Sequence, residues 1–131
     1  MLAVSCVPEA SQIPVVMGSA EFSGVILVVE DPFIRKYVCR ILGRVHDEAI
    51  EAEPRNVASI LESSDLKVRL IVTNEPQLFV GRLEEIPLVY TSAFPDLALA
   101  ARFRWCQILR KPFLPQDLLR AVNALAPAKS M

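Results

Sequence analysis

Short apolar runs alternate along the chain with segments whose apolar residues recur every three to four positions. Residues 24–29 (GVILVV) form a continuous apolar run that ends at Glu30-Asp31-Pro32, which is typical of a parallel strand buried on both faces. The next segment places these apolar residues at helical spacing: Phe33, Ile34, Tyr37, Val38, Ile41 and Leu42. This pattern predicts an amphipathic helix that begins near Pro32 and ends at Gly43.

The same alternation continues to the end of the chain. We expect further strands at residues 48–52, 68–72, 87–90 and 108–110, and further helices at residues 54–64, 95–104 and 115–125. The twelve residues 75–86 between the third and fourth strands are few for a parallel crossover, so a single helical turn or an irregular loop should lie there. Alternating strands and helices predict an α/β fold, with helices on both faces of a five-stranded parallel sheet.

The composition fits one folded domain. The chain has 131 residues, of which 53% are hydrophobic, and a net charge of −1, which excludes disorder as its main state. No run approaches the roughly 20 apolar residues of a membrane helix, and the N-terminus lacks the pattern of a signal peptide. Three widely spaced cysteines, Cys6, Cys39 and Cys106, indicate reduced thiols and a cytoplasmic protein.

The domain boundaries follow from where the periodic pattern begins and ends. Residues 1–23 have no clear period and contain two prolines, so we expect a flexible N-terminal arm there. The folded domain should span residues 24–126, and residues 127–131 should form a C-terminal tail.

Basic residues are concentrated in the C-terminal third of the chain. Residues 1–96 hold 8 Lys and Arg against 14 Asp and Glu, whereas residues 97–131 hold 6 against 1. Because no basic run is interleaved with aromatic residues, we do not expect nucleic-acid binding. A solvated helix surface is the favoured interpretation, and a contact surface for an acidic protein partner is the alternative.

Polar residues follow four of the predicted strands. They are Glu30-Asp31, Thr73-Asn74-Glu75, Thr91-Ser92 and Lys111. In open α/β sheets the loops after the carboxyl ends of the strands form the functional site, so we expect these residues to converge. Nothing in the sequence indicates that the side chain of Glu75 faces that site.

Three segments resemble the receiver domain of two-component response regulators. They are VILVVEDPFIRKYVCRIL, PLVYTSAFPD and ILRKPFLPQDLLRAVNAL, in that order within residues 25–125. The resemblance implies a three-layer flavodoxin-like sandwich with strand order 2-1-3-4-5, here with a shortened third helix, and bacterial signalling. It also implies phosphoryl transfer from a histidine kinase to an aspartate, with Mg²⁺ held by carboxylates beside the phosphoryl group.

Several residues match the family's site. Glu30 and Asp31 match its acidic pair, and Ser92 matches its switch hydroxyl. Lys111-Pro112 matches its Lys-Pro motif, whose peptide bond is commonly cis in the family. Two registers of the acidic pair are open: one residue is deleted after Asp31, or Val29-Glu30 takes the place of the pair.

The phosphate-accepting position does not match. Asn74 stands where the family has its aspartate, and an amide is a poor nucleophile and a weak ligand for a hard cation. We therefore expect an atypical receiver domain that is not phosphorylated and is not an enzyme. It should have no catalytic residue, no cofactor, and at most weak Mg²⁺ binding at Glu30 and Asp31. Lys111 should then pair with Glu30 or Asp31.

Its output would be protein binding. The expected partner is a histidine kinase, a phosphotransfer protein or an effector, and the expected surface consists of Arg102, Arg104, Arg110 and Arg120. Three different functions are also open: a phosphoreceiver with a non-standard acceptor, a flavin-binding enzyme of similar fold, and a homodimeric structural module that exchanges residues 1–20. We expect no membrane contact.

Overall fold

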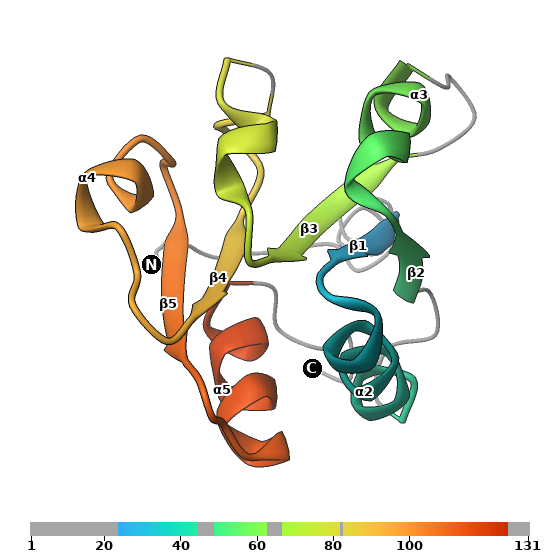
Figure 1. Ribbon diagram of the computed structural model, residues 1–131, viewed down its shortest axis with the longest axis vertical. Helices are drawn as coiled ribbons and strands as arrows, with labels where there is room; N and C mark the ends of the chain where they lie inside the picture. The colour runs from blue at the N-terminus through green and yellow to red at the C-terminus, as the bar shows by residue number, and fades with distance from the viewer. Residues whose placement is uncertain (1–23, 45–48, 63–66, 82, 126–131) are drawn as a thin grey trace, which may run out of the picture.

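Five parallel strands form one sheet in the order β2-β1-β3-β4-β5 (Figure 1). The computed structural model describes residues 24–44, 49–62, 67–81 and 83–125. The strands are β1 (Val25–Val29), β2 (Ala49–Ala52), β3 (Val68–Thr73), β4 (Leu88–Ser92) and β5 (Cys106–Arg110). The predicted fold class and strand order are therefore confirmed.

Helices cover both faces of this sheet (Figure 1). They are α2 (Pro32–Leu42), α3 (Val57–Glu62), α4 (Leu97–Ala100) and α5 (Pro115–Leu125), with 3₁₀ turns η2 (Pro54–Asn56) and η3 (Pro76–Phe79). Ile26 and Val28 of β1 pack in the apolar core beneath α2 and α5. Leu27 and Val29 pack on the opposite face, in the core with α3, η3 and α4. The sheet is buried on both sides because successive side chains of a strand point to opposite faces.

Two of the four helix predictions are confirmed, and two are correct only in part. The amphipathic helix begins at Pro32 with Gly43 as its C-cap, and the last helix spans Pro115–Leu125 as predicted. The helix predicted for residues 54–64 begins as the 3₁₀ turn η2 and becomes α-helical at Val57. The helix predicted for residues 95–104 ends at Ala100. Beyond that point the chain leaves helical geometry, because Phe103 is buried and Arg104 donates its backbone N–H to the carbonyl of Glu84, at 3.0 Å.

The connection between β3 and β4 is a single turn, as its short length predicted. The turn η3 spans Pro76–Phe79, and the Phe79 side chain is fully buried. The turn thus places Phe79 in the core, and Pro76 is also buried while Leu78 packs against the same cluster.

The predicted arm (residues 1–23) and tail (residues 127–131) lie outside the described residues. No helix in the described part of the chain has both the length and the apolar character that crossing a bilayer requires. Cys39 and Cys106 are free thiols, as predicted for these two cysteines.

Candidate functional site

A buried carboxylate lies at the carboxyl edge of the sheet. Glu30 directly follows β1, and only 2% of its surface is exposed. The Thr91 hydroxyl donates a hydrogen bond to Oε2 of Glu30, and the Asp31 backbone N–H donates to Oε1 at 3.0 Å. The Lys111 ammonium lies 3.1 Å from Oε1 and 3.1 Å from Oε2. Both oxygens of Glu30 therefore have two partners each.

Parallel pairing brings these residues together from distant parts of the sequence. Lys111 follows β5, and its backbone N–H donates to the carbonyl of Ser92 at 3.1 Å, which holds it beside the end of β4. The predicted pairing of Lys111 with an acidic residue is present, and its partner is Glu30. A buried carboxylate without such a partner would be strongly destabilising. The Lys111–Pro112 peptide bond is cis.

Asn74 lies at the end of β3, and its backbone N–H donates to the carbonyl of Val29 at 3.3 Å. Its side-chain oxygen Oδ1 is buried and has no hydrogen-bond partner among the described residues. A buried carbonyl without a donor is unfavourable, whereas a carboxylate there would carry a full negative charge next to the end of β1. The amide keeps this part of the edge neutral.

Thr91, which the sequence placed at this edge but to which it gave no role of its own, is the hydroxyl that contacts Glu30. Thr91 is fully buried, whereas the hydroxyl of the neighbouring Ser92 accepts a local hydrogen bond from the Phe94 N–H at 3.1 Å. Adjacent residues of a strand point to opposite sides, so the two hydroxyls have different surroundings. The sequence analysis ended this strand at residue 90, whereas β4 extends to Ser92. With the longer strand, the alternation of side chains would have predicted that Thr91 and Ser92 face opposite sides. A switch role for Ser92 stays a prediction.

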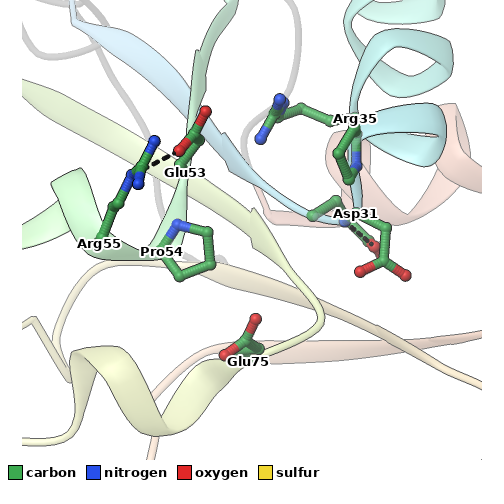
Figure 2. A pocket seen from close by; sticks show the side chains of 8 residues that line it. Asp31, Arg35, Glu53, Pro54, Arg55 and Glu75 are labelled. Atoms are coloured by element: carbon green, nitrogen blue, oxygen red, sulfur yellow. Dashed lines mark hydrogen bonds and ion pairs between the residues drawn. The ribbon is translucent and has the colours of Figure 1, made fainter.

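A cavity of about 480 Å³ lies next to this edge (Figure 2). It is lined by Glu30, Asp31, Pro32, Arg35, Glu53, Pro54, Arg55 and Glu75. Glu75 thus faces the site, although no sequence signal indicated its direction. The cavity's two arginines are already paired: Arg35 with Glu51 at 3.2 Å, and Arg55 with Glu53 at 2.8 Å.

The carboxylate of Glu30, the candidate magnesium ligand, is already occupied by protein partners. The described residues contain no group of three or more His, Cys, Asp or Glu side chains that could hold a metal ion. Mg²⁺ requires a nearly octahedral set of oxygens, and both oxygens of Glu30 already contact Lys111. Weak Mg²⁺ binding at Glu30 and Asp31 stays a prediction.

The predicted arginine surface is partly neutralised. Arg102 pairs with Glu84 at 3.2 Å, Arg104 with Glu85 at 3.2 Å, and Arg120 with Asp117 at 3.4 Å. Arg110, by contrast, forms no ion pair with another described residue. Partner binding by these four residues stays a prediction.

Neither described thiol is suited to nucleophilic chemistry at neutral pH. Burial raises the pKa of the Cys39 thiol to about 11, and the nearby charge of Glu51 adds to this effect. Burial also raises the pKa of Cys106. Because the thiolate is the reactive form, we assign no catalytic role to either residue.

Comparison with known proteins supports the architecture. No protein-family model and no curated protein sequence matches this chain. Among solved structures, the response regulator receiver protein from Sinorhizobium medicae is 18% identical, with a TM-score of 0.63 over 82% of this chain and 98% of that chain. The receiver domain of NtrX from Brucella abortus is 22% identical, with a TM-score of 0.62 over 77% of this chain and 97% of that one. Chemotaxis protein CheY4 from Vibrio cholerae is 14% identical, with a TM-score of 0.61 over 79% and 99%. The chain therefore has the flavodoxin-like fold of response regulator receiver domains.

Proposed function

We propose that this chain is a receiver-like signalling domain that acts by binding another protein and is not phosphorylated at the end of β3. The observation that carries the proposal is the neutral side chain of Asn74, whose buried Oδ1 has no partner among the described residues. The end of β3 belongs to the same carboxyl edge of the sheet as the Glu30–Lys111 pair. The proposed partners are a histidine kinase, a phosphotransfer protein or an effector.

The chemistry supports this proposal. An acyl phosphate forms when a carboxylate oxygen attacks phosphorus, and a neutral amide oxygen is a poor nucleophile for that attack. Phosphoryl transfer also relies on cations that neutralise the transferred group. Here the cation of Lys111 already neutralises Glu30. We therefore propose no catalytic residue and no resident cofactor.

The test is incubation with acetyl phosphate and Mg²⁺, followed by intact-mass spectrometry at neutral pH. We expect no phosphoryl adduct on the wild-type chain, while CheY4 treated in parallel serves as the positive control. An adduct on the wild-type chain would overturn the proposal, and loss of that adduct in Glu75→Gln would identify Glu75 as a non-standard acceptor. Asn74→Asp is the matched variant that restores the missing carboxylate.

A flavin-binding enzyme and a homodimeric structural module are each tested by a separate measurement. A purified protein with the yellow absorbance of a flavin would favour the enzyme. An oligomer that dissociates when residues 1–20 are deleted would favour the structural module. An absorbance spectrum and light scattering of the same sample address both.

A further inference from the structure

The last strand of the sheet, β5, is bordered by exposed apolar side chains. Its one neighbour in the sheet of described residues is β4 (Figure 1). Trp105, which directly precedes β5, is 46% exposed, Ile108 within β5 is 36% exposed, and Leu97 of α4 is 61% exposed. We call these three side chains the β5 strip. An edge strand that shows apolar side chains invites another segment to pack on it, and natural proteins usually cover such an edge.

Ile108 and α4 lie on the same side of the sheet. Cys106 of β5 and Ala100 of α4 pack in one core cluster, and alternate residues of a strand share a face. Ile108 therefore points to the side that α4 covers, and so does Arg110 at the end of β5. Arg110 forms no ion pair with another described residue. The β5 strip thus ends beside an uncompensated positive charge.

Residues 1–23 are rich in apolar side chains and carry only negative charge. Of these 23 residues, 13 are hydrophobic, two are Glu, and none is Lys or Arg. Segments that stay unfolded in water are poor in apolar residues, whereas this segment is as hydrophobic as the whole chain, at 53%. Burial of its apolar side chains would be favourable, and its charge is opposite to that of Arg110.

This segment joins the sheet at the edge where Trp105 lies. It precedes Gly24, and β1 begins at Val25. Because the strands are parallel, β5 begins at the same edge, three strand positions away from β1. Strands about 4.8 Å apart make this distance about 15 Å, which about five extended residues span. The remaining residues of the segment are more than enough to follow β5.

Other exposed apolar side chains are less well placed for this segment. Phe33, Phe94 and Leu114 come after the carboxyl ends of β1, β4 and β5, at the opposite edge of the sheet. The other outer strand, β2, shows no large exposed apolar side chain among its described residues. Among the described residues, Trp105 is the exposed large apolar residue that directly precedes a strand. The β5 strip is therefore the apolar surface that begins where the segment joins the sheet.

We infer that residues 1–23 dock on the β5 strip of their own chain and cover Trp105 and Ile108. Attachment to the same chain gives this segment a high effective concentration at the strip, which favours it over a free peptide. The docked segment closes the surface around Arg110, so a partner that binds there must first displace it. This consequence rests on the proposed binding function, whereas the docking itself does not.

Trp105 is the single tryptophan of the chain, so tryptophan fluorescence reports on the β5 strip. Val15→Ser/Val16→Ser makes the segment more polar within the full chain, and Ser5→Ala/Ser11→Ala is the matched control in the same segment. In the first variant we expect Trp105 emission to move to longer wavelength and acrylamide to quench it more strongly. The control should match the wild type, and circular dichroism verifies that both variants are folded.

A bimane label places a second probe on the segment itself. In a full chain whose native cysteines are replaced by Ala, Ser19→Cys carries the label about five residues before Gly24, where an extended segment should reach Trp105. Tryptophan quenches bimane fluorescence on contact, so we expect a quenched label whose fluorescence is restored by Trp105→Phe. Quenching that does not change on dilution, with the mass of a monomer in light scattering, identifies the segment of the same chain.

Each contrary result overturns the inference. Trp105 emission that is unchanged in Val15→Ser/Val16→Ser, or an equal change in the Ser→Ala control, would exclude docking on the β5 strip. Bimane fluorescence that Trp105→Phe leaves unaltered would do the same. Quenching that is lost on dilution of a dimer would assign the segment to a second copy instead. None of these outcomes depends on phosphorylation, so a phosphoryl adduct would refute the proposed function separately.

Discussion

The ammonium group of Lys111 contacts both carboxylate oxygens of Glu30, each at 3.1 Å. This ion pair connects the ends of β1 and β5, which are separated in the sheet by β3 and β4. The Glu30 side chain is fully buried, and the Lys111 side chain is 22% exposed. One cation thus neutralises the charge at the centre of the sheet edge.

Removal of this cation should destabilise the fold. Lys111→Met leaves the charge of Glu30 buried without its partner, so the free energy of unfolding should fall by about 3 kcal/mol. Urea unfolding followed by circular dichroism measures the change. The exposed neighbour Arg110→Met is the matched control and should change stability by less than about 0.5 kcal/mol.

The double variant Glu30→Gln/Lys111→Met separates pairing from packing. Because neither charge remains, the double variant should be more stable than Lys111→Met alone. A double-mutant cycle should give a coupling energy of about 1–3 kcal/mol. Additive effects of the two substitutions would contradict the ion pair as the source of the stability.

Thr91 and Ser92 should respond differently to loss of their hydroxyls. Thr91→Val keeps the shape but removes the donor to Glu30, so we expect a loss of about 1–2 kcal/mol. Ser92→Ala removes a local acceptor of the Phe94 N–H and should cost less than about 0.5 kcal/mol. Thermal and urea unfolding of the two variants side by side test the assignment, and a larger effect at Ser92 would refute it.

Phe79 should be essential to the short connection between β3 and β4. Its side chain is fully buried, so Phe79→Ala should lower the free energy of unfolding by about 3–5 kcal/mol. Phe94 is 90% exposed, and Phe94→Ala should leave stability almost unchanged. If the two substitutions had similar effects in urea unfolding, the single turn would not be held by the core.

Cys39 should make stability depend on pH in the alkaline range. Burial raises its pKa from 9.0 to about 11, so the unfolded chain loses this proton first. The contribution of the group is therefore complete below about pH 9 and declines as the pH rises to about 11. The stability difference between wild type and Cys39→Ala should shrink over this interval in urea unfolding, and a constant difference would exclude the linkage.

Residue patterns along the chain were enough to predict the order and type of most elements. The apolar run at residues 24–29 and the helical spacing after Pro32 indicated β1 and α2, because burial on two faces and burial on one stripe leave distinct patterns. The short interval after β3 likewise predicted a single turn. Lys111 could be placed at the carboxyl edge because it follows a strand, and parallel strands end at that edge together.

Which of these residues meet depends on the tertiary structure. Register and side-chain direction between strands far apart in sequence decide three features of the site. They decide which acid pairs with Lys111, that Thr91 rather than Ser92 contacts Glu30, and that Glu75 lines the cavity. The early end of α4 likewise follows from the burial of Phe103, a contact with another element. Local periodicity reports which face of an element is apolar, whereas these pairings arise only when the sheet brings separate elements into contact.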